Sequence, residues 1–167
     1  MNKLVKTLLV VGIIALVFIG GCSTLVGKYN SMVTKQEAVN TAWSQVENVY
    51  QRRADLIPNL VNTVQGYANF EKSTLTAVIE ARAKATQVTI NPGENLTPEK
   101  LQQFTQAQDG LSSTLSRLMV VVEKYPDLKA NENFMALQTQ LEGTENRITT
   151  ERRKFNEVAR DYNTYIK

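Results

Sequence analysis

The chain of 167 residues contains no histidine and only one cysteine, Cys22. Without histidine, Ser-His-Asp and Cys-His nucleophile systems and the H-E-x-x-H zinc site are excluded. With one cysteine, an intrachain disulfide and a cysteine-rich metal cluster are excluded as well. The sequence also lacks the G-x-S-x-G, Walker and G-x-G-x-x-G motifs. We therefore expect a protein that is not an enzyme, with no catalytic residues, no metal and no cofactor.

Charge is distributed unevenly along the chain. All 16 acidic residues lie at or beyond Glu37, whereas Lys3 and Lys6 stand within the first six residues. From Lys28 onward, 17 basic residues oppose 16 acidic ones, so most of the formal net charge of +3 comes from the N-terminus. A nucleic-acid-binding domain concentrates positive charge in its folded part. We therefore expect no nucleic-acid partner.

The first 27 residues have the pattern of a membrane anchor. The 21 residues between Lys6 and Lys28 carry no charge. A helix of that length reaches about 31 Å, enough to cross a hydrocarbon core about 30 Å thick. Residues 1–27 are therefore predicted to form a transmembrane helix. Lys3 and Lys6 favour a cytoplasmic N-terminus, which places residues 28–167 on the periplasmic or outer side of a bacterial envelope membrane.

The same residues also fit a lipoprotein signal peptide. The densest apolar run, Leu8 to Ile19, has the length of a signal-peptide h-region. It leads into Ile19-Gly20-Gly21-Cys22, which resembles a bacterial lipobox, although isoleucine stands where leucine is usual. In such signals the cysteine is lipidated and becomes the mature N-terminus. Cys22 is thus a candidate lipidation site, and both interpretations predict attachment to membrane lipid through the N-terminus.

Beyond residue 28, apolar side chains recur at alternating spacings of three and four residues. This is the period of one face of an α-helix. The first run contains Tyr29, Met32, Val39, Trp43, Val46, Tyr50, Ile57, Leu60, Val64 and Tyr67. Neighbouring apolar positions widen the stripe, which suits a bundle of several helices better than a two-stranded coiled coil.

The second half of the chain repeats the helical pattern and adds clear boundaries. Thr97-Pro98-Glu99 combines an N-cap, a proline at the first helical position and an early acidic residue. Tyr125-Pro126-Asp127 ends that helix, because a proline restricts the residue before it. The remaining predicted elements are a shorter alanine-rich helix over 71–88, a loop over 89–96 and a last helix with stripe positions from Phe134 to Tyr165.

These patterns together predict an all-α protein. Residues 28–167 are expected to form an elongated, antiparallel, up-and-down bundle of about four helices behind the N-terminal anchor. The first and last of these helices are expected to be long.

Two charged residues stand on stripes where apolar side chains are expected. They are Arg53 on the first helix and Glu151 on the last. Because an unpaired buried charge is costly, one explanation is that they pair across the two helices and set the register of the seam. The other is that they reach solvent at the edge of the bundle.

Pro58 lies inside the first stripe, with apolar positions on both sides. A proline removes one backbone donor and crowds the carbonyl of the residue four positions earlier, here Ala54. We expect a kink near 54–58, with Asp55 or Asn59 satisfying the freed backbone groups. The alternative is a break, with Pro58 opening a new helix.

Several of these segments resemble the LemA family of bacterial membrane proteins. The resemblance extends from about Tyr29 to the C-terminus and is strongest in A-W-S-Q-V-E-N-V-Y-Q-R-R-A-D-L-I-P-N-L-V from Ala42 to Val61. Further matches are G-Y-A at 66–68, E-N-R-I at 145–148, R-R-K-F-N-E at 152–157 and D-Y-N at 161–163.

The resemblance implies a membrane anchor, a helical bundle and no established enzymatic activity. It also directs attention to polar positions in the matching segments. These are Arg52, Arg53, Asp55, Asn59, Asn146, Arg152 and Asn156. The glycine-cysteine junction at Cys22 is not general in that family, so the nature of the anchor stays open.

Three functions are compatible with the sequence, and one of them is a purely structural role as an envelope spacer, suggested by the length of the first predicted helix. The first is a membrane-tethered, non-enzymatic interaction or scaffold protein whose partner is another protein or a second copy of the chain. The alternative is an envelope sensor or signalling bundle that binds a small ligand between its helices. A cavity near Arg53 and Asn59 would favour the alternative, and a fully packed interior there would contradict it.

Overall fold

A computed structural model describes residues 3–67, 70–88, 90 and 97–167 of the chain. Every regular element in these described residues is helical, which confirms the predicted all-α fold. The helices are α1 (Lys3–Gln65), α2 (Lys72–Gln87), α3 (Pro98–Val122), α4 (Pro126–Lys129) and α5 (Glu132–Tyr165). As predicted, the first and last are the longest. Most of the predicted loop at 89–96, including Asn91-Pro92-Gly93, lies outside the described residues, as does Ala68.

The chain divides into two compact units. One comprises Asn40–Phe155, and the other comprises Met1–Val39 together with Asn156–Lys167. The unit Asn40–Phe155 contains the apolar core, to which all four longer helices contribute. Its most deeply buried apolar side chains are Val46, Ile57, Leu60, Val64, Val78, Ile90, Leu111, Leu118, Leu128 and Phe134.

Within this unit α1 and α5 run antiparallel. Trp43 of α1 packs edge-on against Phe155 of α5, with ring centroids 5.2 Å apart. Further along α1, Arg53 pairs with Glu145. Ten residues forward on α1, from 43 to 53, therefore correspond to ten residues backward on α5, from 155 to 145.

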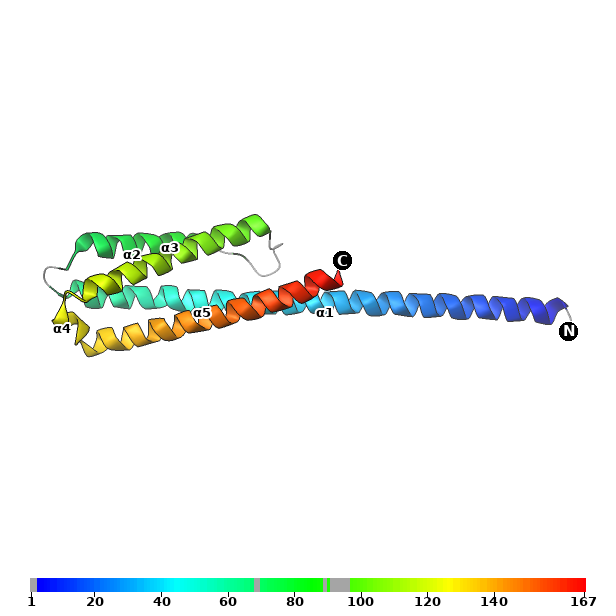
Figure 1. Ribbon diagram of the computed structural model, residues 1–167. Coiled ribbons are helices and arrows are strands. Elements are labelled where there is room, and N and C mark those ends of the chain that lie inside the picture. The colour runs from blue at the N-terminus through cyan, green and yellow to red at the C-terminus, as the bar shows by residue number, and fades with distance from the viewer. Residues whose placement is uncertain (1–2, 68–69, 89, 91–96) are drawn as a thin grey trace. The chain divides into compact units, whose positions relative to one another are not determined.

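The other two long helices complete an up-and-down arrangement. α3 follows the direction of α1, because Tyr50 packs on Phe104 with ring centroids 5.1 Å apart and the next turn of α1 contacts the next turn of α3 through Arg53 and Gln108. α2 lies beside α3 (Figure 1) and runs in the opposite direction. The short α4 connects α3 to α5.

The boundaries of α3 and α5 follow from local chemistry. The Thr97 hydroxyl accepts a hydrogen bond from the Lys100 backbone N–H at 3.3 Å, and Pro98 begins the helix, so the predicted N-cap is confirmed. α3 ends at Val122, slightly before the predicted stop, and Pro126 then opens α4. Asn131 caps α5, its side-chain oxygen accepting from the Phe134 N–H at 3.0 Å.

Helix α1 continues through Pro58 to Gln65, so the alternative prediction, a helix break at this proline, is wrong. The carbonyl of Ala54, which loses its usual donor to the proline, accepts a hydrogen bond of 2.8 Å from the Arg82 Nε of α2. The expected partners, Asp55 and Asn59, do not serve this carbonyl. The Asp55 carboxylate accepts hydrogen bonds and has none to donate to a carbonyl, and the Asn59 side chain is exposed, whereas Arg82 comes from the helix packed against this face. The kink itself stays a prediction.

The second unit joins the N-terminal part of α1 to the end of α5. Lys35 pairs with Asp161 and lies over the ring of Tyr165, 5.4 Å from its centroid. The Tyr165 hydroxyl donates to the Lys28 carbonyl at 3.1 Å.

The same unit contains the apolar stretch of α1. Among the described helices, α1 is the one long and apolar enough to cross a membrane, and none of that stretch is buried. Cys22 lies within it and is exposed.

Candidate functional site

Arg53 is the central polar residue of the bundle. Its side chain is 1% exposed, although it stands on a stripe of apolar core residues. Its Nη1 donates to Ser112 Oγ at 2.6 Å and to Glu145 Oε2 at 2.9 Å. Its Nη2 donates to the side-chain and backbone oxygens of Gln108 at 2.7 and 3.1 Å. One guanidinium group therefore ties α1 to α3 and α5.

The partners of Arg53 are themselves held in place. Gln108 is buried and donates from Nε2 to the Ala85 carbonyl of α2 at 3.1 Å, which adds the fourth long helix to the network. The ring of Tyr50 lies 5.1 Å from the Arg53 guanidinium carbon, a distance at which the ring quadrupole attracts the cation. The Nε atom of Arg53 is buried without a hydrogen-bond partner in the described part of the chain.

The first of the two explanations, a pair between Arg53 and Glu151, is wrong, because Arg53 pairs with Glu145. Glu151 pairs instead with Lys154 on its own helix, at 2.8 Å. The register of α1 and α5 explains this, because the Trp43–Phe155 contact places residue 145, and not residue 151, opposite residue 53. The choice between a paired and a solvated Arg53 is nevertheless decided, since this arginine is buried and paired.

The other polar motif residues of α1 lie on its outer face. Arg52, Asp55 and Asn59 are all exposed, and Asp55 accepts a hydrogen bond from Gln51 Nε2 at 2.8 Å. They do not join the Arg53 network. Asn59 does not line the cavity that opens beside Arg53 between α3 and α5.

The motif residues of α5 are also exposed. Arg152 lies 3.8 Å from the Asp109 carboxylate of α3 and 3.5 Å from the Tyr50 hydroxyl of α1. Asn146 is exposed beside Glu145, and Asn156 is exposed in the second unit. Among the predicted site residues, the structure thus brings Arg152 to a contact between three helices and leaves both asparagines on the surface.

Two titratable groups near this network have pKa values shifted by burial. Burial raises the pKa of Tyr50, and the nearby positive charges of Arg152 and Arg53 partly oppose this rise. Burial also raises the pKa of Glu47, opposed by contacts of its carboxyl with the Trp43 side chain and the Ile90 backbone. Both groups therefore favour their neutral forms more than they would in water.

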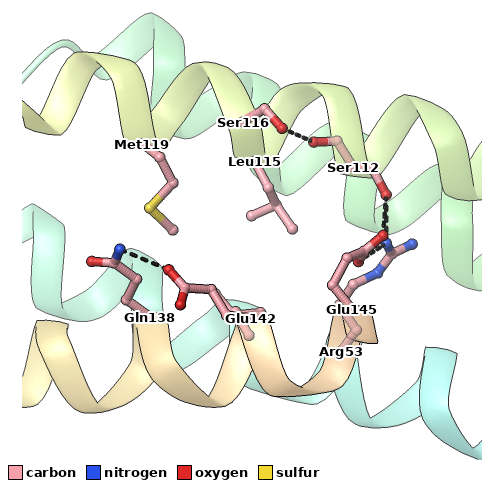
Figure 2. Close-up of a pocket in the computed structure, with 9 residues that line it drawn as sticks. Arg53, Ser112, Leu115, Ser116, Met119, Gln138, Glu142 and Glu145 are labelled. Carbon is pink, nitrogen blue, oxygen red and sulfur yellow. Dashed lines mark hydrogen bonds and ion pairs between the residues drawn. The ribbon is translucent and has the colours of Figure 1, made fainter. Parts of the chain in front are cut away.

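A cavity of about 200 Å³ opens beside Arg53, between α3 and α5. Figure 2 shows its two walls, with Leu115 and Met119 on α3 opposite Gln138 and Glu142 on α5. Ser112 and Ser116 of α3 and Leu141 and Glu145 of α5 complete the lining. The cavity thus combines an apolar middle with carboxylates and hydroxyls at its edges.

Sequence reasoning did not identify the α3 and α5 partners of Arg53. Gln108 stands on the apolar stripe of α3, and this misplaced polar residue was the available signal. Ser112 resembles an ordinary helix-interior serine, and Glu145 resembles an ordinary surface acid. Glu145 begins the E-N-R-I segment of the family resemblance, but neither residue could be assigned as a partner of Arg53, because their role depends on where α3 and α5 lie against α1.

The fold and this network define a class of protein: an all-α bundle closed around a buried arginine, whose first helix also contains an exposed apolar stretch able to cross a membrane. The chain belongs to the LemA family, whose family model matches residues 42–167. The matched range includes the whole Arg53 network.

Curated relatives agree with this assignment. The chain is 28% identical over 179 aligned residues to the magnetosome protein MamQ of Magnetospirillum gryphiswaldense and to magnetosome protein MamQ 1 of Paramagnetospirillum magneticum, covering 97% of this chain and 65% of each relative. It is 26% identical over 141 residues to protein LemA of Metamycoplasma hominis, covering 84% of this chain and 60% of the relative. The chain therefore spans less than two thirds of the length of these relatives.

Proposed function

We propose that this protein is a membrane-anchored, non-enzymatic interaction module, whose binding surface is the outer face of α1. The observation that carries the proposal is a stripe of exposed polar residues on that helix. We call it the amide face, and it consists of Asn48, Arg52, Asp55, Asn59 and Asn62.

The spacing of the amide face supports a binding role. Its residues alternate by four and three, so they form one continuous line along α1. Three of the five are asparagines, which are poor helix formers at interior positions. Within the described residues, the side chains of Asn48, Arg52, Asn59 and Asn62 form no hydrogen bond or ion pair. Their amide and guanidinium groups are therefore available to a partner.

The charge of the amide face indicates the kind of partner. Arg52 and Asp55 have opposite charges, and the remaining residues are neutral, so the face has no net charge. A polar protein surface that forms directional hydrogen bonds fits this face better than an anionic lipid surface or a nucleic acid does. The partner is another protein or a second copy of this chain.

The membrane anchor completes the proposed function. The exposed apolar stretch of α1 is long enough to cross a bilayer, and Lys3 and Lys6 favour a cytoplasmic N-terminus. We infer that the bundle lies on the periplasmic or outer side of the membrane. Cys22 is then either part of a retained span or the lipid attachment point.

Site-specific photo-crosslinking in native membranes tests the amide face. A photoreactive amino acid at Asn62 of the full-length chain is expected to give a discrete adduct, and Arg52→Ala is expected to reduce its yield about fivefold or more, because interface hydrogen bonds are lost. The matched control is Arg147→Ala, which removes the same charge from an exposed position of α5. A photoreactive residue at the exposed Thr139 provides the control for labelling.

Adduct mass then distinguishes a second copy from a different protein. Equal labelling from residues 62 and 139, or a yield that Arg52→Ala leaves unchanged, would contradict the proposal.

A second candidate function is favoured by the cavity beside Arg53. A bundle that binds a small ligand between α3 and α5 would serve as an envelope sensor, because the occupant would change how firmly these helices are held together. The methyl group of Met119 lines the cavity and reports its occupancy by NMR. A cavity that takes up neither charged nor neutral small molecules would exclude this function.

A further inference from the structure

The cavity between α3 and α5 has an uncompensated negative charge. Of its three charged lining residues, Arg53 and Glu145 form an ion pair at 2.9 Å and neutralise each other. The third, Glu142, accepts a hydrogen bond from the neutral Gln138 Nε2 at 2.9 Å and pairs with no cation among the described residues. Glu142 therefore gives the cavity one formal negative charge that no cation of the lining compensates.

The two carboxylates of the cavity lie on one face of α5. Glu142 and Glu145 are three residues apart, and the charge of Glu145 is compensated by Arg53. Figure 2 shows Glu142 on the α5 wall of the cavity, with Met119 and Leu115 on the opposite wall. A cation bound at Glu142 would compensate its charge, whereas an anion would be repelled by it.

The rest of the lining has a different chemistry. Leu115 and Leu141 are almost completely buried at the cavity wall, and Met119 adds a flexible apolar side chain that adapts to irregular shapes. The hydroxyl of Ser112 is already engaged by Arg53, and that of Ser116 donates to the Ser112 carbonyl. The available contacts are therefore an apolar surface and one carboxylate.

We infer that this cavity binds a small organic cation: a protonated primary amine with a short apolar chain, its ammonium group at Glu142 and its chain against Leu115, Met119 and Leu141. The inference rests on the second candidate function and names its ligand class. The volume of about 200 Å³ sets the size of the ligand, since an apolar protein cavity of about 150 Å³ already accommodates benzene.

Competition for Arg53 argues against an anionic ligand. A carboxylate or phosphate ligand would have to displace Glu145 from Arg53 or approach with two glutamates nearby. Four hydrogen bonds from the terminal nitrogens of Arg53 are already formed, and its remaining donor, Nε, is fully buried. The guanidinium group is thus held as part of the bundle and not presented to a ligand.

The test uses the full chain in lipid nanodiscs with isotope-labelled methionine methyl groups. The chain has four methionines, so the signal of Met119 is assignable by substitution, and Met32 and Met135 serve as internal controls for effects on the membrane or on folding. Three probes of similar size are titrated: n-pentylammonium, 1-pentanol and pentanoate.

The expected result is a saturable shift of the Met119 signal with n-pentylammonium and a much weaker response to the other two probes. Glu142→Gln is expected to weaken n-pentylammonium binding about fivefold or more, because it removes a partly exposed ion pair. Glu80→Gln, an exposed glutamate of α2 outside this cavity, is the matched control and should leave binding unchanged.

The outcomes separate this inference from the function on which it rests. Saturable binding of 1-pentanol or pentanoate without preference for the amine would overturn the ligand class and leave a ligand-binding cavity in place. An amine response that Glu142→Gln does not weaken would likewise overturn the assigned position of the charge. No saturable response of Met119 to any probe would overturn both the inference and the second candidate function.

Discussion

Arg53 is an uncommon residue in a helical core, because charged side chains are rarely fully buried unless they are paired. It is charged, it is almost completely inaccessible to solvent, and its partner Glu145 is about half-exposed, with 50% side-chain exposure. Removing such a charge from water is costly unless hydrogen bonds replace the lost hydration. Gln108 and Ser112 provide those bonds from α3. The residue therefore acts as a specific connection among helices whose other contacts are mostly apolar.

A double-mutant cycle measures this connection. We expect Arg53→Met to lower the free energy of unfolding by about 3 kcal/mol, since it removes the partner of the buried Gln108 and of Glu145. Glu145→Gln is expected to cost less, about 1–2 kcal/mol, because this carboxylate is partly hydrated. The combined variant should be more stable than the sum of the two losses predicts. Urea unfolding of the full chain in detergent, followed by far-UV circular dichroism, gives these values.

Glu151→Gln is the control in the same cycle. Because Glu151 pairs with Lys154, its effect should add to that of Arg53→Met with no coupling beyond about 0.5 kcal/mol. A coupling energy between Arg53 and residue 151, or no coupling energy between Arg53 and residue 145, would contradict the register of α1 and α5.

At the scale of elements, α1 depends on α2 for one of its backbone hydrogen bonds. Pro58 has no N–H to offer the Ala54 carbonyl, and Arg82 Nε supplies the missing donor. An arginine on the packed face of α2 looks unfavourable by helix pattern alone. Its position is explained by the backbone acceptor that Pro58 leaves on the neighbouring helix.

This compensation is testable by changing both residues. We expect Arg82→Met to destabilise the bundle by about 1–2 kcal/mol, because it leaves the Ala54 carbonyl without a donor. In the Pro58→Ala background the restored N–H of residue 58 can bond to Ala54, so the same Arg82→Met change should cost less than about 1 kcal/mol. Thermal unfolding of the unchanged chain, the two single variants and the double variant gives the loss of stability in each background. Equal costs in the two backgrounds would show that Arg82 acts through packing alone.

For the whole molecule, the central question is what the N-terminal part of α1 does. We expect the full chain to remain in the membrane fraction under alkaline extraction, because this part of the helix is long, apolar and exposed. Deleting residues 1–27 should release a soluble, helical protein, which fractionation and circular dichroism would detect. Persistence of the truncated chain in the membrane fraction would contradict the assignment of the anchor to these residues.

Mass analysis of the mature N-terminus separates the two forms of anchor. An intact Met1 or Asn2 means a retained span. A diacylglyceryl group on an N-terminal Cys22 means a lipoprotein, and in that case the first 21 residues are absent from the mature chain.

Much of the fold could be predicted from local patterns. Helix boundaries depend on interactions within a few residues, so they could be predicted from the sequence. Examples are the N-cap at Thr97, the helix start at Pro98 and the end of α3 before Pro126. Three residues of the amide face, Arg52, Asp55 and Asn59, stood out in the sequence only as polar positions of the segments that resemble the LemA family. The residues that line the cavity could not be predicted, because they depend on how far apart α3 and α5 lie.

Local patterns along the chain were enough to predict that it is helical, which faces of its helices are apolar, and that Arg53 stands among core residues. Periodicity defines the inward face of each helix, but it does not say which residue of one helix lies opposite which residue of the next. That register depends on the connections between helices and on large contacts such as Trp43 with Phe155. The packing of the helices therefore sets two contacts that local patterns do not reveal: Arg53 pairs with Glu145 instead of Glu151, and Arg82 donates to the carbonyl freed by Pro58.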